Sequence, residues 1–362
     1  MRAAQALRVT LERDYPEHIV VEQDVLEMMP KSFRKLYRDL YLEMVSKSPN
    51  LFGWLYDKTD RPFKSDLVRQ TFEKANAGKF FDFVKDFNPE LAICTHFLPA
   101  SLLHDRRRKG KYPGQIATVV TDFDIHGMWL ATPCDNLFVA GEEAKFYLQS
   151  FPNFDTDVVV SGVPTHPVFS KSIGREKAAE KLGLRSDLTT LLLSTGGFGV
   201  GNLEEILGPL KGCKHKLQLV VACGRNEELR EKLAKQFAQP DWHFIGFTDK
   251  LDQYMECTDL MLGKPGGLTT WESFVKGVAW VVINPIPGQE ERNTYHLLEE
   301  GVGLWAYEPR TLAFKIDALL DNPEKLASMQ KRSRALARPD SCQVILEKLL
   351  GPRQKKEAAE GV

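Results

Sequence analysis

The sequence predicts an α/β protein with two domains, each a parallel β-sheet covered by helices. Short apolar runs of strand length alternate with helical patterns along most of the chain. Several runs end in glycine or polar turns that open a helix, as in parallel βαβ units. A length of 362 residues is enough for two domains of ordinary size. We expect domains at 1–165 and 166–338, a crossover helix at 339–352 and a disordered tail at 353–362.

The composition indicates a soluble globular protein and argues against nucleic-acid-binding, disulfide-rich and zinc-binding classes. Hydrophobic residues make up 43% and charged residues 27% of the chain, as in soluble globular proteins. The net charge of −1 gives no overall field for nucleic acid, so no nucleic-acid partner is expected. Six scattered cysteines without a CxxC pair argue against a disulfide framework or a zinc site. With no apolar run of membrane-spanning length and no signal peptide, a cytoplasmic location is expected.

The sequence opens inside a helix, which Tyr15 and Pro16 end, and a strand is expected at 18–25. Residues 31–58 are rich in aromatic and basic side chains, and their first part has the apolar spacing of an amphipathic helix. This region either packs on its own domain or lies in a lipid interface. A basic run at 106–109 would then attract it to an anionic membrane, unless the run is a solvated loop.

Four strands are expected in the first domain, at 91–95, 116–121, 136–140 and 158–160. Polar side chains follow the first two, namely His96, Asp122 and His126. Ligands bind at the carboxyl ends of parallel strands, so these three are candidate catalytic residues. The alternative is that they are ordinary turn and cap residues.

Residues 162–171 contain two prolines and no periodicity, which favours an interdomain hinge. A helix at 173–184 and a strand at 188–194 then open the second domain. Gly196, Gly197 and Phe198 follow this strand and precede a helix at 203–210, an arrangement suited to an anion. Strands at 217–223 and 242–247 follow, and each ends in polar residues.

The sequence then repeats the pattern of strand, glycine turn and helix between 260 and 283. Gly266 and Gly267 permit a tight turn, and Thr269 and Glu272 have the spacing of a capping box with Thr269 as N-cap. A buried strand at 279–283 places polar residues just beyond its end. Helices at 294–300, 311–336 and 340–350 and a strand at 303–306 complete the chain.

This stretch resembles the donor-sugar signature of the monogalactosyldiacylglycerol synthase and processive diacylglycerol glucosyltransferase family. The family shares its GT-B architecture, two Rossmann-like domains facing a cleft with a C-terminal helix crossing back, with the peptidoglycan UDP-N-acetylglucosamine transferase. The matching strings are KPGGLT at 264–269, Glu272, PGQE at 287–290 and Asn293. Further matches in the first domain are TD at 121–122, His126, Trp129 and GVP at 162–164. CGRN at 223–226 matches in the second domain.

The resemblance implies an inverting glycosyltransferase that moves a hexose from a UDP-sugar to diacylglycerol or a similar lipid at an anionic membrane surface. No metal or other cofactor is expected, and the protein would be peripheral at the inner face of the cell membrane. The sugar, glucose or galactose, stays open. The residues implied in UDP-sugar binding are Gly196, Gly197, Phe198, Arg225, Asn226, Phe247, Thr248, Lys264, Pro265, Gly266, Gly267, Leu268, Thr269, Glu272, Gln289, Glu290 and Asn293.

The resemblance also leads us to expect a segment before the first helix that this sequence lacks. The family has a strand there, followed by a glycine-rich loop that ends in Gly-His and carries the candidate base. Alternatives to the diacylglycerol enzyme are a UDP-N-acetylglucosamine transferase acting on a lipid-linked precursor, a UDP-sugar epimerase of the same fold, and a catalytically impaired UDP-sugar-binding protein.

Overall fold

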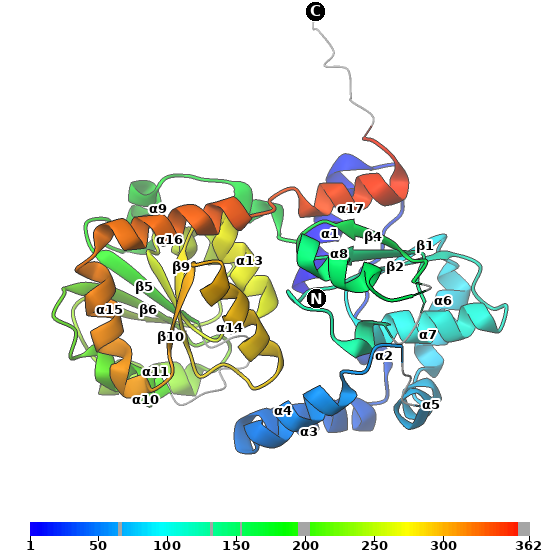
Figure 1. Ribbon diagram of the computed structural model, residues 1–362, viewed down its shortest axis with the longest axis horizontal. Helices are drawn as coiled ribbons and strands as arrows, with labels where there is room; N and C mark the ends of the chain where they lie inside the picture. The colour runs from blue at the N-terminus through cyan, green and yellow to red at the C-terminus, as the bar shows by residue number, and fades with distance from the viewer. Residues whose placement is uncertain (64–66, 131–132, 153, 195–202, 354–362) are drawn as a thin grey trace, which may run out of the picture.

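The computed structural model places two parallel sheets side by side, each with its own helices (Figure 1). It describes residues 1–63, 67–130, 133–152, 154–194 and 203–353. The predicted fold class, two Rossmann-like domains, is confirmed. Apart from Arg353, the predicted tail lies outside the described residues.

The first sheet has the strand order β1-β2-β3-β4 and is parallel throughout. Its strands are β1 (Leu91–Cys94), β2 (Gln115–Val119), β3 (Asn136–Val139) and β4 (Asp157–Val160). All four were predicted. The central strands β2 and β3 carry fully buried side chains such as Ile116 and Phe138, as expected for a sheet covered on both faces.

The first helix, α1 (Arg2–Asp14), ends where predicted, with the Tyr15 N–H donating to the Leu11 carbonyl. The strand predicted at 18–25 is wrong, because residues 18–24 form neither helix nor strand. An ion pair between Arg8 Nε and Glu22 Oε2 (2.9 Å) fastens this extended segment to α1 instead. Ile19 stays 86% exposed, so the apolar run at this point is not the buried face of a strand.

The aromatic and basic region forms two helices, α3 (Lys31–Lys47) and α4 (Pro49–Thr59), because Pro49 cannot continue α3 and starts α4. Within the described residues, no helix is long and apolar enough to cross a membrane. The other helical segments of this half are α2 (Val25–Met28), α5 (Leu67–Ala75), α6 (Gly78–Phe87), α7 (Phe97–Arg108), η1 (Gly127–Leu130) and α8 (Glu142–Gln149).

The second sheet has the parallel order β10-β9-β8-β5-β6-β7. Its strands are β5 (Thr189–Ser194), β6 (Leu217–Ala222), β7 (Trp242–Ile245), β8 (Leu260–Gly263), β9 (Ala279–Ile283) and β10 (Gly303–Ala306). The helical segments around it are α9 (Arg175–Leu182), α10 (Leu203–Leu210), α11 (Glu227–Gln236), α12 (Leu251–Glu256), α13 (Gly267–Lys276), α14 (Gln289–Glu299), η3 (Pro309–Thr311), α15 (Leu312–Leu320) and α16 (Pro323–Leu336). The central strands carry buried leucine and valine side chains on both faces of the sheet.

The chain passes between the two halves twice. The predicted hinge contains a short helix, η2 (Pro167–Ser170), and α17 (Ser341–Leu350) returns the C-terminal part to the first sheet. Cys342 and Ile345 of α17 pack with Ala6, Leu7 and Phe138 in one core cluster. Figure 1 shows α17 beside α1, at the opposite end of the molecule from α3 and α4. The two halves are therefore tied together by core packing as well as by chain connectivity.

Candidate donor-sugar site between the two sheets

The first half touches the second at the start of α13. A Cβ atom added to Gly267 would overlap the Thr121 carbonyl oxygen and lie 3.2 Å from Asp122 Oδ1. Thr121 and Asp122 follow β2, so the carboxyl end of that strand rests directly on the glycine turn. Only glycine fits such a close backbone approach.

The predicted N-cap at Thr269 is wrong. Helix α13 begins at Gly267, and its N-cap is Gly266, which has no side chain to cap with. Thr269 therefore lies in the first turn of the helix and Glu272 in the second. The capping box does not form because the N-cap lies three residues earlier than its spacing requires.

Both side chains bind Arg2 of α1 instead. Arg2 Nη1 donates to Glu272 Oε1 (3.0 Å) and Oε2 (2.7 Å), and Arg2 Nη2 donates to Thr269 Oγ1 (3.0 Å). Burial raises the pKa of Glu272 to about 7, and the charge of Arg2 opposes that rise. Arg2 was not among the predicted site residues, because nothing in its local sequence pattern shows that α1 lies against α13.

The residues that follow β9 support the turn after β8 and the loop before α14. Asn293 Nδ2 donates to the Pro265 carbonyl (2.9 Å), and Glu290 Oε2 accepts from the Ile286 N–H (2.7 Å). Helix α14 begins at Gln289 rather than at the predicted residue 294. Burial raises the pKa of Glu290, and the nearby Lys264 opposes this. Asn293 thus supports the turn at Pro265, and Glu290 supports the loop at Ile286 that precedes its own helix.

Gln289 reaches across to the other sheet, where its Nε2 donates to Asp122 Oδ1 (2.5 Å). Burial raises the pKa of Asp122 to about 6. Of the three candidate catalytic residues, Asp122 is therefore the one that the structure brings into contact with the predicted donor site.

The two candidate histidines hold local structure. His126 is 2% exposed; its Nε2 lies 2.9 Å from the Tyr56 carbonyl, and its Nδ1 accepts from the Met128 N–H (3.2 Å). These partners require a neutral ring with its proton on Nε2. His96 is the N-cap of α7, with Nδ1 accepting from the Leu98 N–H. Desolvation is the largest cause of a lowered pKa at His96, and the partial exposure of the side chain limits this shift.

The segment after β2 also inserts an aromatic ring between the halves. Phe123 stacks on Trp271 (5.5 Å between ring centroids) and on His296 (5.3 Å). His296 Nε2 lies 2.7 Å from Asp124 Oδ1, and this hydrogen bond raises the pKa of His296. Sequence reasoning missed Phe123 and His296, which have no motif spacing and meet only in the folded chain.

At the predicted uracil end, polar side chains again support the backbone. Asn226 Oδ1 caps α11 by accepting from the Leu229 N–H (3.0 Å), and Thr248 Oγ1 accepts from the Lys250 N–H (3.0 Å). The Arg225 guanidinium lies 4.9 Å from the centroid of the Phe247 ring, which is 69% exposed. An exposed flat ring of this kind is suited to stacking on a base. The predicted Gly196, Gly197 and Phe198 lie outside the described residues.

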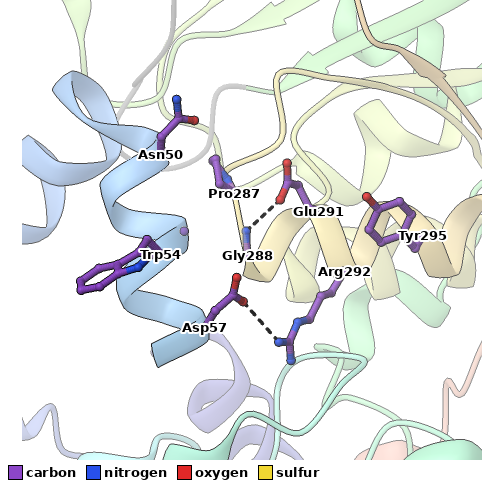
Figure 2. Close-up of a pocket in the computed structure, with 9 residues that line it drawn as sticks. Asn50, Trp54, Asp57, Pro287, Gly288, Glu291, Arg292 and Tyr295 are labelled. Carbon is purple, nitrogen blue, oxygen red and sulfur yellow. Dashed lines mark hydrogen bonds and ion pairs between the residues drawn. The ribbon is translucent and has the colours of Figure 1, made fainter. Parts of the chain in front are cut away.

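A groove of ≈ 410 Å³ separates α4 from the start of α14. Figure 2 shows α4 on one side and the segment from Pro287 to Tyr295 on the other. Arg292 crosses between them to Asp60 (2.7 Å) and Asp57 (3.6 Å). The lining side chains are mainly polar or aromatic and come from Asn50, Trp54, Asp57, Pro287, Glu291, Arg292 and Tyr295.

Comparisons with known proteins agree with the resemblance noted in the sequence. Residues 1–165 match the family model of monogalactosyldiacylglycerol (MGDG) synthase, and residues 202–345 match the glycosyltransferase family 28 C-terminal domain. A processive diacylglycerol beta-glucosyltransferase of Bacillus pumilus is 28% identical over 337 residues, covering 92% of this chain and 87% of that protein. Its Bacillus subtilis counterpart is 26% identical with the same coverage.

Solved structures support the fold. MurG of Acinetobacter baumannii has a TM-score of 0.56 at 17% identity and covers 80% of this chain and 82% of its own. The S. aureus MnaA structure with UDP has a TM-score of 0.58 at 14% identity and covers 79% of this chain and 80% of its own. At these identities the likeness shows a shared architecture.

Proposed function

We propose that this chain transfers a hexose from a UDP-sugar to diacylglycerol, because residues 1–165 match the family model of MGDG synthase and residues 202–345 match that of the glycosyltransferase family 28 C-terminal domain. The observation that carries the proposal is the contact between Asp122 and Gln289 at the glycine turn. It puts a carboxylate of one domain beside the loop where the resemblance places the donor sugar.

The second domain offers the groups that a UDP-sugar needs. The first N–H groups of α13 have no partner within the helix and attract a diphosphate. Glu272 is the ribose ligand, and Gln289 is placed to bind a sugar hydroxyl. Phe247 stacks on the uracil ring.

Asp122 acts as the general base. The acceptor hydroxyl oxygen attacks the anomeric carbon, the bond from that carbon to the diphosphate oxygen breaks, and UDP leaves. Asp122 takes the proton of the hydroxyl as the new glycosidic bond forms. Attack from the face opposite the leaving group inverts the anomeric centre. Burial holds the pKa of Asp122 near 6, so the carboxylate is ionised at neutral pH yet more basic than an exposed aspartate.

The acceptor reaches the site along α4. Leu51 and Trp54 are 50% and 56% exposed on this helix, and Leu36 of α3 is 54% exposed. Apolar side chains exposed together on neighbouring helices are suited to a lipid interface. The polar groove between α4 and α14 leads from these helices toward Pro287 and Gly288, so a lipid head group is the ligand we assign to it.

The basic run at 106–109 is largely neutralised within the protein. Arg107 pairs with Asp135 (2.6 Å), and Lys109 and Arg108 pair with Asp105 (2.7 and 3.5 Å). We therefore assign attraction to anionic lipid to Lys31 and Lys35, which are exposed on α3 beside the apolar residues. This attraction would keep the protein peripheral at the inner face of the cell membrane.

Transfer needs no metal in this proposal. The N–H groups at the start of α13 and the nearby Lys264 ammonium offset the charge that develops on the diphosphate. Excess EDTA should therefore leave the initial rate of UDP release unchanged. A rate that falls in EDTA and returns with Mg²⁺ would contradict metal-independent transfer.

Replacing Asp122 tests the base. Asp122→Asn keeps an oxygen for Gln289 but cannot take a proton, so the rate of hexose transfer should fall by about 10²–10⁴-fold while UDP affinity stays unchanged. The measurements are UDP release with diacylglycerol and UDP calorimetry. If the transfer rate fell by that factor in His96→Gln while Asp122→Asn stayed active, His96 and not Asp122 would be the general base.

Replacing the exposed apolar residues of α4 tests the membrane face. The unchanged protein should co-sediment with vesicles of diacylglycerol and anionic lipid, and salt should release part of it because exposed charges are screened within about 8 Å. Leu51→Ser with Trp54→Ser should abolish sedimentation. The matched control is Phe314→Ser, which removes a 75% exposed ring from the second domain. Equal loss in the control would refute a specific role for α4.

A further inference from the structure

The ion pair between Arg2 and Glu272 joins the first domain to the carboxylate that we assign to ribose. The Arg2 side chain is 48% exposed, whereas that of Glu272 is 4% exposed. Two bonds to Glu272 and one to Thr269 fix the guanidinium against the side of α13. A buried carboxylate in the second domain thus has its counter-ion on the other domain.

The other charged groups around α13 lie at a distance from this carboxylate or face elsewhere. Asp122 approaches the helix start at Gly267 and bonds to Gln289. Lys276 pairs with Glu256 at the opposite end of the helix, where Arg334 of α16 packs on Gly277. Among the described residues, Arg2 is therefore the charged group that acts on Glu272.

By its number of lone pairs, Glu272 can accept from a second donor in addition to Arg2, although its side chain is only 4% exposed. A carboxylate has about four lone-pair positions. Arg2 Nη1 uses one on each oxygen, so each oxygen keeps a position for a ribose hydroxyl. The ribose therefore does not have to displace Arg2.

We propose that Arg2 is a positioning residue of the donor site, which keeps Glu272 ionised and oriented for the ribose hydroxyls only while the two domains are together. This inference rests on the proposed donor site. It makes UDP binding depend on domain closure, because the carboxylate is an effective acceptor only when α1 delivers its counter-ion. Binding and closure then favour each other.

The direction in which UDP affinity should change with pH follows from burial and the charge of Arg2, which shift the pKa of Glu272 in opposite directions. Burial raises the pKa of Glu272 to about 7 even with Arg2 present. An opposite charge at this distance lowers a carboxyl pKa by about 1–3 units, so removing Arg2 raises it further. UDP affinity falls as the pH falls through the Glu272 pKa, and the fall should start at higher pH without Arg2.

The test measures the affinity for UDP by calorimetry between about pH 5.5 and pH 10.5, a range that spans both the titration at about 7 and its expected upward shift. The variant is Arg2→Met, which keeps a long side chain without charge. Its affinity profile should shift upward by about 1–3 pH units and rejoin that of the unchanged protein at high pH. Glu272→Gln lacks the titrating carboxyl, so the pH dependence of UDP affinity that remains in this variant measures the contribution of the nucleotide's own titration. Arg8→Met, which removes a charge from the same helix, should leave the profile in place.

A second readout needs no nucleotide. The ¹³C resonance of the Glu272 carboxyl, assigned by its loss in Glu272→Gln, should titrate at higher pH in Arg2→Met. An equal loss of UDP affinity at every pH would overturn the inference, because Arg2 would then contact UDP directly without acting on the charge of Glu272. Tighter UDP binding at every pH would also overturn it, because Arg2 would then compete with the ribose for Glu272. An unshifted carboxyl titration would overturn it too. If the unchanged protein bound no UDP at any pH, the proposed donor site would fail, whatever the carboxyl titration showed.

Discussion

The close approach of Gly267 to the Thr121 carbonyl is the constraint on which the interdomain site depends. It lets the carboxyl end of β2 rest on the start of α13 without an intervening side chain. From that contact follow the reach of Gln289 to Asp122 and the insertion of Phe123 between the halves. The first-domain groups all lie in the segment that follows β2, and their partners lie on α13 and α14, so a small displacement of the domains would separate all of these contacts.

Much of the fold was predictable from the sequence because buried parallel strands are continuous apolar runs. Ala279–Ile283 and Gly303–Ala306 lie where the pattern puts them. The strand expected at 18–25 failed for a physical reason. Its run of β-branched residues describes one chain segment, whereas a strand also needs a neighbour to pair with, and Arg8 holds Glu22 in another arrangement.

The site was predictable in part for a similar reason. Motif spacing indicated Glu272, Gln289 and Asp122, and the structure brings all three to one junction. The spacing also suggested that Thr269 caps its helix, but the chain after the glycine turn is already helical from Gly267, so the N-cap is Gly266. Arg2 belongs to no motif. Its role depends on how α1 packs against the second domain, which local sequence does not encode.

The central claim is that Glu272 binds the ribose of a UDP-sugar at this junction. The most direct measurement compares UDP with 2′-deoxy-UDP, by calorimetry, in the unchanged protein and in Glu272→Ala. The account predicts that loss of the hydroxyl weakens binding by about 1–3 kcal/mol in the unchanged protein and has little further effect in the variant. Equal losses in both proteins would contradict it, because the hydroxyl and the carboxylate would then act independently.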